Sequence, residues 1–437
     1  MEALRVAFTT PGFRNLFVIV VGWLCTTGVH AVTEALVVTG VAERRHHETF
    51  HRFFSRGAWI PDEVGFAAFR LIRALLDEAA PIRAVIDDTV ASKKGPKVFG
   101  LGSHVDPVRS TKKHKAFTFG HCWVVLAVLV PVPFSRRTFA LPVLLRLYRN
   151  KKECNRAGAP YRKKTELARE LLQILVQWAG TLRIELAMDA AYCNDTVLDD
   201  LPSTVTVFGS MRPDAVVTAP PPRRRKGQRG RPPVRGETLP KPQALASDDT
   251  VPWSRTTATL YGERQTVWYK TFCAQWYRAC GGRLLRIVVV RVDSGKIPLR
   301  VFFSTDPHLC VRYLLEAYAG RWNIEVTFRE LKQLLGFADS SARLRKAVER
   351  VAPLVAFMYS LLVVWFARGV YAQPVAAPPN RPWYTHKRGF SFADILRAAR
   401  RVLADANVLD PGCNFNNLRK IPQPRRVPSA TARRRAA

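Results

Sequence analysis

Residues 318–337, which read YAGRWNIEVTFRELKQLLGF, are the stretch that says most about the fold of this chain. Plotted as a helix at about 100° per residue, one face about 80° wide is polar. It carries Tyr318, Arg321, Glu325, Arg329 and Lys332. The adjoining side is apolar and carries Ile324, Phe328, Leu331 and Leu335. We therefore expect the apolar side to pack on a core while the polar face lines a site.

A single carboxylate between cations on a helix face has two interpretations. Side chains three and four residues apart form ion pairs that stabilise a helix without any further role. Alternatively, Glu325 is a metal ligand and the cations beside it hold the phosphates of a substrate. The spacing alone leaves both interpretations open.

The pattern Tyr318-x2-Arg321-x3-Glu325-x6-Lys332 resembles the Tyr-Arg-Glu-Lys signature of a large group of bacterial insertion-sequence transposases. The four residue types and the three gaps match, and Trp322 and residues 331–337 are also similar to that group. The resemblance covers about residues 80–370, and more loosely the N-terminus. It implies a DDE transposase with an RNase H-like core and a catalytic Asp-Asp-Glu triad.

The resemblance also implies where the rest of the triad lies. The first acid of the group ends the first core strand in an Asp-Thr step, here Asp88-Thr89 after the β-branched run 82–86. The second ends a later strand, here Asp189 after residues 184–188. Because side chains alternate along a strand, only one of Asp87 and Asp88 faces the site. We choose Asp88, which directly precedes Thr89, and Asp87 remains the alternative.

Three carboxylates suit the hydrolysis of a phosphodiester, which needs an activated water and relief of charge on the leaving oxygen. Two divalent ions about 3.5 to 4 Å apart meet both needs, and Mg²⁺ prefers carboxylate and phosphate oxygens. The resemblance implies two Mg²⁺ ions, with Mn²⁺ as a substitute. In that arrangement Asp88 bridges the ions, while Asp189 and Glu325 each complete the shell of one.

Further residues are expected to contact DNA. Arg321, Arg329 and Lys332 would position phosphates, and Tyr318 would hydrogen-bond a phosphate near the cut. In the resembled group an aromatic of the insertion holds a flipped base. The candidates by position are Trp253, Trp268 and Trp276, and the alternative for each is packing inside the insertion.

The remaining chain predicts the fold class α/β: an RNase H-like mixed-sheet core, a helical N-terminal region and a β-rich insertion before the last catalytic helix. We expect a helical DNA-binding region over 1–80, the core over 81–210 and 283–370, and a β-rich basic insertion over 211–282. Residues 284–293 and 297–303 are typical of a β-hairpin around Ser294-Gly295. Residues 371–437 form a basic, Pro-rich region that we expect to be partly disordered.

Two basic segments outside the core are also expected to bind DNA. Residues 33–38 and 43–56 around Gly40 are typical of a helix-turn-helix whose second helix displays Arg44 and Arg45. An ordinary helical bundle with a solvated basic face explains the same pattern. The Arg-Gly-Arg-Pro run with Arg229 and Arg231 resembles an AT-hook, and the simpler interpretation is a flexible loop that neutralises phosphates.

Composition agrees with a nucleic-acid partner. The 437 residues carry 68 Lys and Arg against 34 Asp and Glu, a formal charge of +34. Such a charge attracts polyanions and gains affinity from released counterions. The eight scattered cysteines form no C-x-x-C pair, which fits a reducing cytoplasm. The apolar runs at 16–38 and 351–366 are interpreted as buried helices, so we expect no membrane partner.

The segment His47-Glu48-Thr49-Phe50-His51 formally matches the H-E-x-x-H motif of zinc proteases. No third ligand is evident, and the preceding basic residues favour a DNA-facing helix. A third hypothesis is a catalytically silent DNA-binding protein derived from a transposase. The sequence predicts a transposase in the bacterial cytoplasm, associated with the nucleoid. Its partners would be terminal inverted repeats, target DNA and a second copy of the chain.

Overall fold

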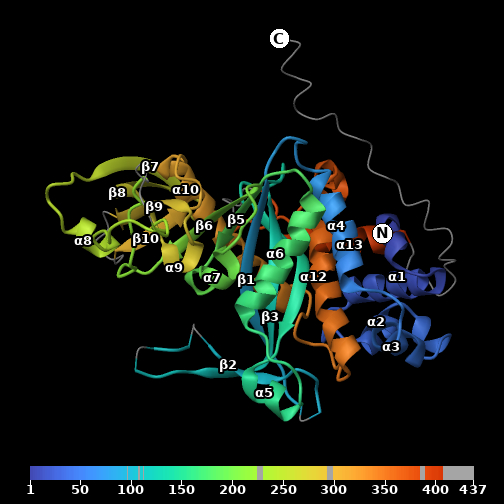
Figure 1. Cartoon of the computed structure of the whole chain (residues 1–437). Helices are drawn as coiled ribbons and strands as arrows, with labels where there is room; N and C mark the ends of the chain where they lie inside the picture. The colour runs from blue at the N-terminus through green and yellow to red at the C-terminus, as the bar shows by residue number, and fades with distance from the viewer. Residues whose placement is uncertain are drawn as a thin grey trace.

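The computed structural model describes residues 1–95, 97–106, 109–111, 113–223, 230–292, 299–383 and 389–406. One large sheet runs through the molecule, with the N-terminal helices at one side and the inserted strands at the other (Figure 1). Residues 407–437 of the predicted basic C-terminal region, the hairpin turn at Ser294-Gly295 and Arg229 lie outside the described residues.

The centre of the sheet is built from five strands in the spatial order β4-β3-β1-β5-β6. They are β1 (Ile82–Ser92), β3 (Phe117–Val130), β4 (Phe139–Tyr148), β5 (Ile184–Met188) and β6 (Val205–Met211). β3 is antiparallel to both β1 and β4, whereas β5 is parallel to β1 and β6 is parallel to β5. This order, with three antiparallel strands followed by two parallel ones, is the RNase H-like arrangement that the sequence predicts.

Four further strands, here called the inserted strands, continue this sheet beyond β6; two lie in the expected insertion 211–282 and two in the segment 283–370 that was expected to belong to the core. β10 (Arg300–Ser304) pairs antiparallel with β6, and β9 (Leu284–Val292), β8 (Glu263–Gln275) and β7 (Ser254–Leu260) follow in order. The predicted hairpin strands are confirmed as β9 and β10, which pair antiparallel. Because β10 covers the free edge of β6, the inserted strands extend the core sheet instead of forming a sheet of their own.

Helices cover both faces of the central strands. α6 (Lys164–Ala179) packs on β3 and β4, and α4 (Pro61–Arg73) lies along β4 with Phe66 and Phe69 against Trp178 of α6. α11 (Asn323–Leu334) and α12 (Arg345–Ala367) also pack on β4. α12 is long and apolar enough to span a bilayer, but 83% of its most apolar window is buried within the protein. That burial supports the interpretation of this run as a core helix.

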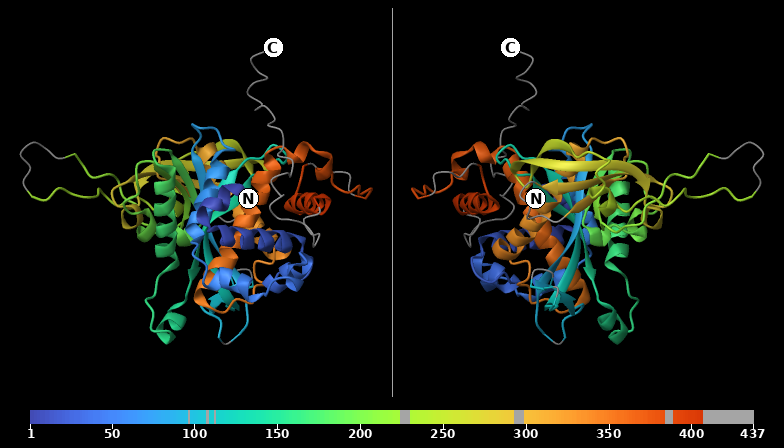
Figure 2. Two further views of the ribbon diagram at one scale, coloured as in Figure 1. Left: turned by 90° about the vertical axis from the view of Figure 1, so that its right-hand side faces the viewer. Right: turned by 90° about the vertical axis from the view of Figure 1, so that its left-hand side faces the viewer.

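The N-terminal region is helical, as predicted, and packs with the C-terminal helix. It contains α1 (Thr10–Cys25), α2 (Val32–Val38) and α3 (Glu48–Ser55), beside α13 (Phe392–Asp405) (Figure 2). Arg400 of α13 donates to the carbonyls of Leu24 and Thr26 at the end of α1, at 2.6 and 2.9 Å. These bonds satisfy carbonyls that the helix end leaves free.

The expected helix over 43–56 is wrong in its first part. A 3-10 turn η2 (Val41–Glu43) and a non-helical stretch precede α3, which begins only at Glu48. Arg44 and Arg45 therefore lie before the second helix and not on it. Gly40 adopts φ 65 between α2 and η2, so the predicted glycine turn is present.

The remaining elements are short. They are η1 (Glu2–Ala7), β2 (Gly102–Val105), α5 (Lys151–Arg156), η3 (Ala190–Tyr192), α7 (Asp195–Leu198), α8 (Pro242–Ala246), α9 (Tyr277–Cys280), α10 (Val311–Ala319), η4 (Gly320–Trp322), η5 (Val370–Ala372) and η6 (Pro374–Ala376). The seven cysteines of the described residues are free thiols.

Candidate active site

The parallel pairing of β1 and β5 places two acids side by side in the middle of the sheet. The register pairs Ile82 with Ile184 and ends at Ile86 with Met188. The residues that follow on the two strands are Asp87 and Asp189. Asp189 caps η3, because its Oδ1 accepts from the backbone N–H of Ala190 at 2.7 Å. This cap fixes the second acid at the carboxyl end of β5.

The third acid arrives on two joined helices. α10 carries Tyr318, the 3-10 turn η4 carries Arg321, and Glu325 lies in the first turn of α11. The predicted apolar stripe is confirmed, since Ile324, Phe328, Leu331 and Leu335 are all buried. That stripe holds α11 on the core, so the position of Glu325 is set by packing as well as by sequence.

Arg321 connects the first and third acids. Its Nη1 lies 2.6 Å from Oδ2 of Asp87, and its Nη2 lies 3.0 Å from Oε1 of Glu325. The side chains of Arg321 and Asp87 are only 15% and 16% exposed. The guanidinium also interacts electrostatically with Asp189. Arg321 therefore pairs with two carboxylates that are remote in sequence, and the third, Asp189, lies beside Asp87 in the β1–β5 register.

The neighbouring acids and Arg321 shift each other's pKa values. Burial raises the pKa of Asp87 to about 7, and the carboxylates of Asp88 and Asp189 act in the same direction, while Arg321 opposes it. Burial works against the charge of Arg321, but Asp87, Tyr318 and Glu325 outweigh it and raise the pKa of Arg321. The arginine is therefore held firmly in its charged form between the acids.

Asp88 faces the other side of the sheet. Its Oδ2 accepts from Nζ of Lys164 at 2.6 Å, and its Oδ1 accepts from the hydroxyl of Tyr192 at 2.7 Å. Cys122 on β3 points to the same carboxylate at 3.4 Å. The expectation that Asp88 lies with Asp189 and Glu325 is therefore corrected: strand alternation places Asp87 on that face and leaves Asp88 in a separate polar cluster.

The donor chemistry fits a divalent cation, because carboxylate oxygens are the hard ligands that Mg²⁺ prefers. Within the described ranges, however, no three acidic, His or Cys side chains lie close enough to hold a metal ion. The guanidinium of Arg321 lies between Asp87 and Glu325 and carries the positive charge there. Joint coordination by the three acids therefore requires this side chain to move aside.

Of the other predicted DNA contacts on this face, two are exposed and one is buried. Arg329 and Lys332 are exposed along α11. Desolvation of the Lys332 ammonium lowers the pKa of this side chain. The carboxylate of Asp106 acts in the opposite direction. Tyr318 is buried, and its hydroxyl donates to Oγ of Ser210 at 3.3 Å. In this arrangement Tyr318 supports α10 and is not presented to a phosphate.

The three tryptophans proposed from the sequence to hold a flipped base have different surroundings in the structure. Trp276 packs edge-on against Phe303 at 5.6 Å. Trp253 is flanked by Lys270 and Arg291, each 4.8 Å from its ring centroid. Arg255 lies 5.9 Å from the ring of the remaining candidate, Trp268. For Trp253 and Trp276 the packing alternative is the one the structure favours.

An exposed aromatic pair near the acids was missed. Trp322, next to Arg321, is 48% exposed, and its ring lies 6.1 Å from that of Tyr261, which is 62% exposed. Tyr261 occupies the β7–β8 turn with φ 55. β7 is tied to α10 because the N–H of Thr259 donates to Glu316 at 2.9 Å. The position of Trp322 after Arg321 was a usable signal, whereas only the fold brings Tyr261 to it.

The remaining predicted DNA-binding arginines lie away from the acids. Arg44 and Arg45 are exposed before α3, and Arg45 lies 5.0 Å from the ring of Phe50. α3 packs on α12, across the core from the inserted strands (Figure 1). Arg231 is exposed in the loop after β6. The structure does not bring these residues to the carboxylates.

The H-E-x-x-H segment is built around an ion pair. Oε1 of Glu48 accepts from Nε of Arg52 at 2.9 Å, one helical turn away. The rings of His47 and His51 lie 5.5 Å apart at the start of α3. Glu48 thus has a helix-stabilising partner in the structure.

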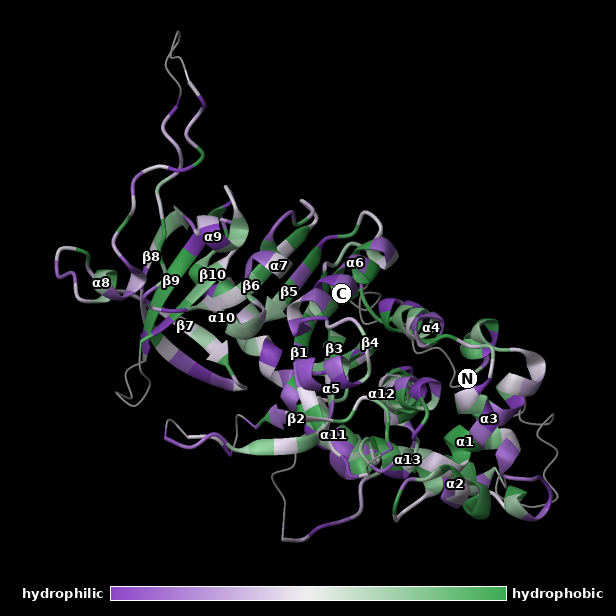
Figure 3. Ribbon diagram, turned by 60° about the horizontal axis from the view of Figure 1, so that its bottom comes forward, coloured by the Kyte–Doolittle hydropathy of each residue, from purple (hydrophilic) through white to green (hydrophobic). Residues whose placement is uncertain are grey.

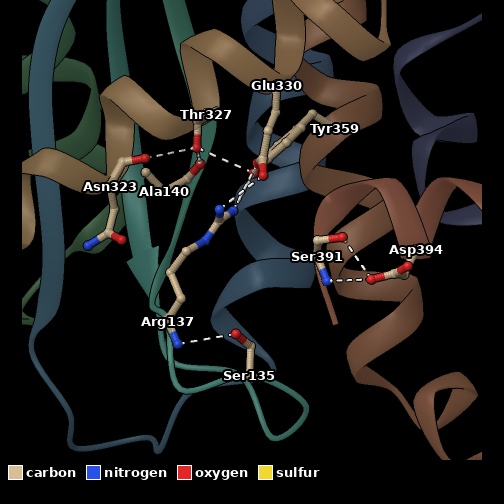
Figure 4. Close-up of polar contacts among 9 residues, drawn as sticks. All are labelled: Ser135, Arg137, Ala140, Asn323, Thr327, Glu330, Tyr359, Ser391 and Asp394. Atoms are coloured by element: carbon tan, nitrogen blue, oxygen red, sulfur yellow. Dashed lines mark hydrogen bonds and ion pairs between the residues drawn. The ribbon is translucent and has the colours of Figure 1, made fainter. Parts of the chain in front are cut away.

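A buried polar network holds α11 from behind. Glu330 on α11 accepts two bonds from Arg137, at 2.9 and 2.8 Å, and one from the hydroxyl of Tyr359 on α12 at 2.6 Å (Figure 4). Thr327 donates to the carbonyl of Ala140 on β4 at 2.9 Å. Phe392 of α13 stacks on Tyr359 at 4.1 Å. The helix that carries Glu325 is therefore bound to β4 and α12 by both apolar and polar contacts.

A mixed sheet in the order β4-β3-β1-β5-β6, with one acid within β1, one directly after β5 and a third on a helix against the sheet, defines an RNase H-like nuclease core. A family model described as DDE superfamily endonuclease matches residues 4–273, which is more than half of the chain. The chain therefore belongs to the DDE endonuclease family. Asp87, Asp88 and Asp189 fall within the match, and Glu325 lies beyond its end. No curated protein matches the chain.

Proposed function

We propose that this chain is a DNA transposase that cleaves transposon ends and joins them to target DNA with divalent metal ions. The observation that carries the proposal is that Arg321 pairs with both Asp87 and Glu325, while the parallel register of β1 and β5 places Asp189 beside Asp87. Membership of the DDE endonuclease family supports nuclease chemistry. DNA ends would enter from the exposed side of α11, where Arg329 and Lys332 lie.

In this proposal Asp87 takes the place that the sequence-based hypothesis gave to Asp88. Asp87, Asp189 and Glu325 would hold Mg²⁺, or Mn²⁺ in its place, and two ions are expected. When bound, the ions supply an activated nucleophile and neutralise the leaving oxygen. Arg321 would leave the carboxylates and bind a phosphate, for which its planar guanidinium is suited. Burial of Asp87 keeps water from competing for its oxygens.

Strand transfer needs no further machinery. It is the same in-line displacement at phosphorus, with a freed 3′-hydroxyl as nucleophile in place of water. Two ends must be joined, so a second copy of the chain is a further proposed partner, together with terminal inverted repeats and target DNA. The charge of +34 supports binding to all of these DNA segments and a nucleoid location in a bacterial cytoplasm.

The direct test is nicking of supercoiled plasmid that carries candidate inverted repeats. We expect nicked and linear products with Mg²⁺ or Mn²⁺ and none with EDTA. Glu325→Gln, purified identically, controls for contaminating nuclease, and Glu48→Gln should cleave as the unmodified chain does. Metal-independent products, or DNA binding with no cleavage in any sample, would contradict the proposal, the latter in favour of a silent DNA-binding protein.

The exposed Trp322–Tyr261 pair is proposed to stack on bases that leave the duplex near the cut. Trp322→Ala should weaken binding to a duplex with an unpaired end by about tenfold, because stacking contributes roughly 1–3 kcal/mol per base. Affinity for a blunt duplex should change little. Fluorescence anisotropy measures both, and Trp383→Ala, which removes a ring that is 84% exposed, is the control. Equal losses on both duplexes would show that Trp322 has no role in stacking.

A further inference from the structure

A two-stranded arm projects from the core at the end of the sheet where β1 finishes. β2 pairs antiparallel with residues 117–120 at the start of β3, beyond the point where β1 ends at Ser92 opposite Gly120. Thr118 donates to Oδ2 of Asp106 at 2.9 Å, and the N–H of Asp106 donates to Ala116 at 2.9 Å. We call residues 102–106 and 113–120 the β2–β3 arm. Figures 1 and 3 show it extending from the base of the sheet toward the side of the inserted strands.

One face of the arm is apolar and exposed. Val105, Phe117 and Phe119 are 50%, 58% and 51% exposed. Val105 is directly paired with Phe117, and Ser103 with Phe119, so the three apolar side chains share one face of the ribbon. Exposing two phenyl rings on a narrow ribbon is unfavourable in the free protein, which points to a surface that is covered when the protein acts.

This face is on the carboxylate side of the sheet. Side chains alternate along β3, so Phe117 and Phe119 share a side with Trp123 and Val125. Val125 is paired with Asp87, and the β1–β3 register runs from there to Ser92 without a shift. Two contacts confirm the assignment: Trp123 meets Phe337, which follows α11, at 6.4 Å, and Cys122 meets Asp88 on the opposite side at 3.4 Å.

The chain in and around the arm is basic. From Lys93 to His121 the sequence has seven Lys or Arg residues, two of which (Lys113 and Lys115) belong to the arm itself, and a single acid, Asp106, which is bonded to Thr118. Lys113 and Lys115 are exposed. Figure 3 shows apolar strand residues and a hydrophilic end on this arm. Asp106 interacts electrostatically with Lys332 of α11, so the arm continues the charged face that carries Glu325.

We propose that the β2–β3 arm is a second contact surface for duplex DNA and enters a groove of the duplex that lies in the carboxylate site. This inference rests on the proposed function, because it takes DNA as the substrate. A two-stranded ribbon fits the major groove, where apolar side chains contact thymine methyl groups. A second copy of this chain is a poorer occupant, because the arm and a chain of charge +34 repel each other.

The test is binding of a short fluorescent duplex of mixed sequence in EDTA, measured by anisotropy over a range of salt concentrations. EDTA prevents cleavage, so the result does not depend on whether the protein is a nuclease. The variants are Phe117→Ser/Phe119→Ser and Lys113→Ala/Lys115→Ala. The matched control is Trp383→Ser, which removes an exposed aromatic far along the chain in the segment before α13. Thermal melting identifies any variant that does not fold.

The Phe pair should lower the affinity by about tenfold or more at unchanged salt dependence, because apolar contacts release no counterions. The Lys pair should lower the slope of log affinity against log salt by about two. Unchanged affinity in a folded Phe variant would overturn the inference. So would loss of a dimer in sedimentation with DNA affinity per chain unchanged, which would assign the arm to a second copy. DNA binding through the arm without metal-dependent cleavage by the unmodified chain would reject the proposed function alone.

Discussion

Replacing Asp87 with asparagine is expected to reduce metal-dependent cleavage by about a thousandfold or more, which corresponds to about 4 kcal/mol of lost transition-state stabilisation. The amide keeps the size of the side chain but removes the negative charge that would bind a divalent ion. The loss of Asp87 should not unfold the protein, because Arg321 keeps its ion pair with Glu325. Burial already raises its pKa to about 7, so its charge is held at a cost in the folded state.

The matched variant is Asp88→Asn, one residue along the same strand. Lys164 and Tyr192 lose a charged acceptor, so we expect a loss of stability of about 1–3 kcal/mol with cleavage largely retained at low temperature. Rates are compared in Mg²⁺ on the same plasmid, after melting curves establish that both variants are folded. The opposite result would be loss of cleavage in Asp88→Asn with activity kept in Asp87→Asn. That result would show that Asp88, and not Asp87, is the metal ligand.

Replacing Glu330 with alanine is expected to cost about 3–5 kcal/mol of stability. The carboxylate accepts two bonds from Arg137 and one from Tyr359, and its side chain is 11% exposed. Its removal leaves the guanidinium of Arg137, itself only 28% exposed, without its charged partner. The free energy of unfolding in urea, followed by circular dichroism and tryptophan fluorescence, measures the loss.

Two further variants make this prediction specific. Glu349→Gln removes the partner of Arg345 in an exposed ion pair of α12 and should cost less than about 1 kcal/mol. The double variant Arg137→Met/Glu330→Met should recover much of the loss, because it removes both charges together. An equally unstable double variant would mean that shape, and not the uncompensated charge, makes Glu330 necessary.

Much of the site could be predicted because the required signals are local. The spacing of Tyr318, Arg321 and Glu325 and the apolar stripe beside them follow from the geometry of one helix. The strands that lead into Asp87-Asp88 and into Asp189 follow from short apolar runs, although β1 continues past the two acids to Ser92. The structure divides this segment into α10, η4 and α11, and the apolar face is kept after the division.

Other features could not be predicted because they depend on partners far along the chain. Lys164 and Tyr192 bind the carboxylate of Asp88, and Arg321 binds that of Asp87. Packing of helices on the two faces of the sheet therefore decides which acid lies near Glu325. The alternation rule says that one of the two acids must face away, but gives no means of choosing. Arg44 and Arg45 fell outside the expected helix because α3 begins only at Glu48.

The sequence by itself determined the fold class, the three segments that carry the acids and the basic character that calls for DNA. These properties reside in hydrophobic periodicity, strand-end acids and net charge, each of which is written in neighbouring residues. Only the tertiary structure decided that Asp87 joins Glu325, that the insertion extends the core sheet, and that Tyr261 reaches Trp322. The physical reason is that strand pairing and helix packing bring together residues whose separation in the chain leaves no local pattern.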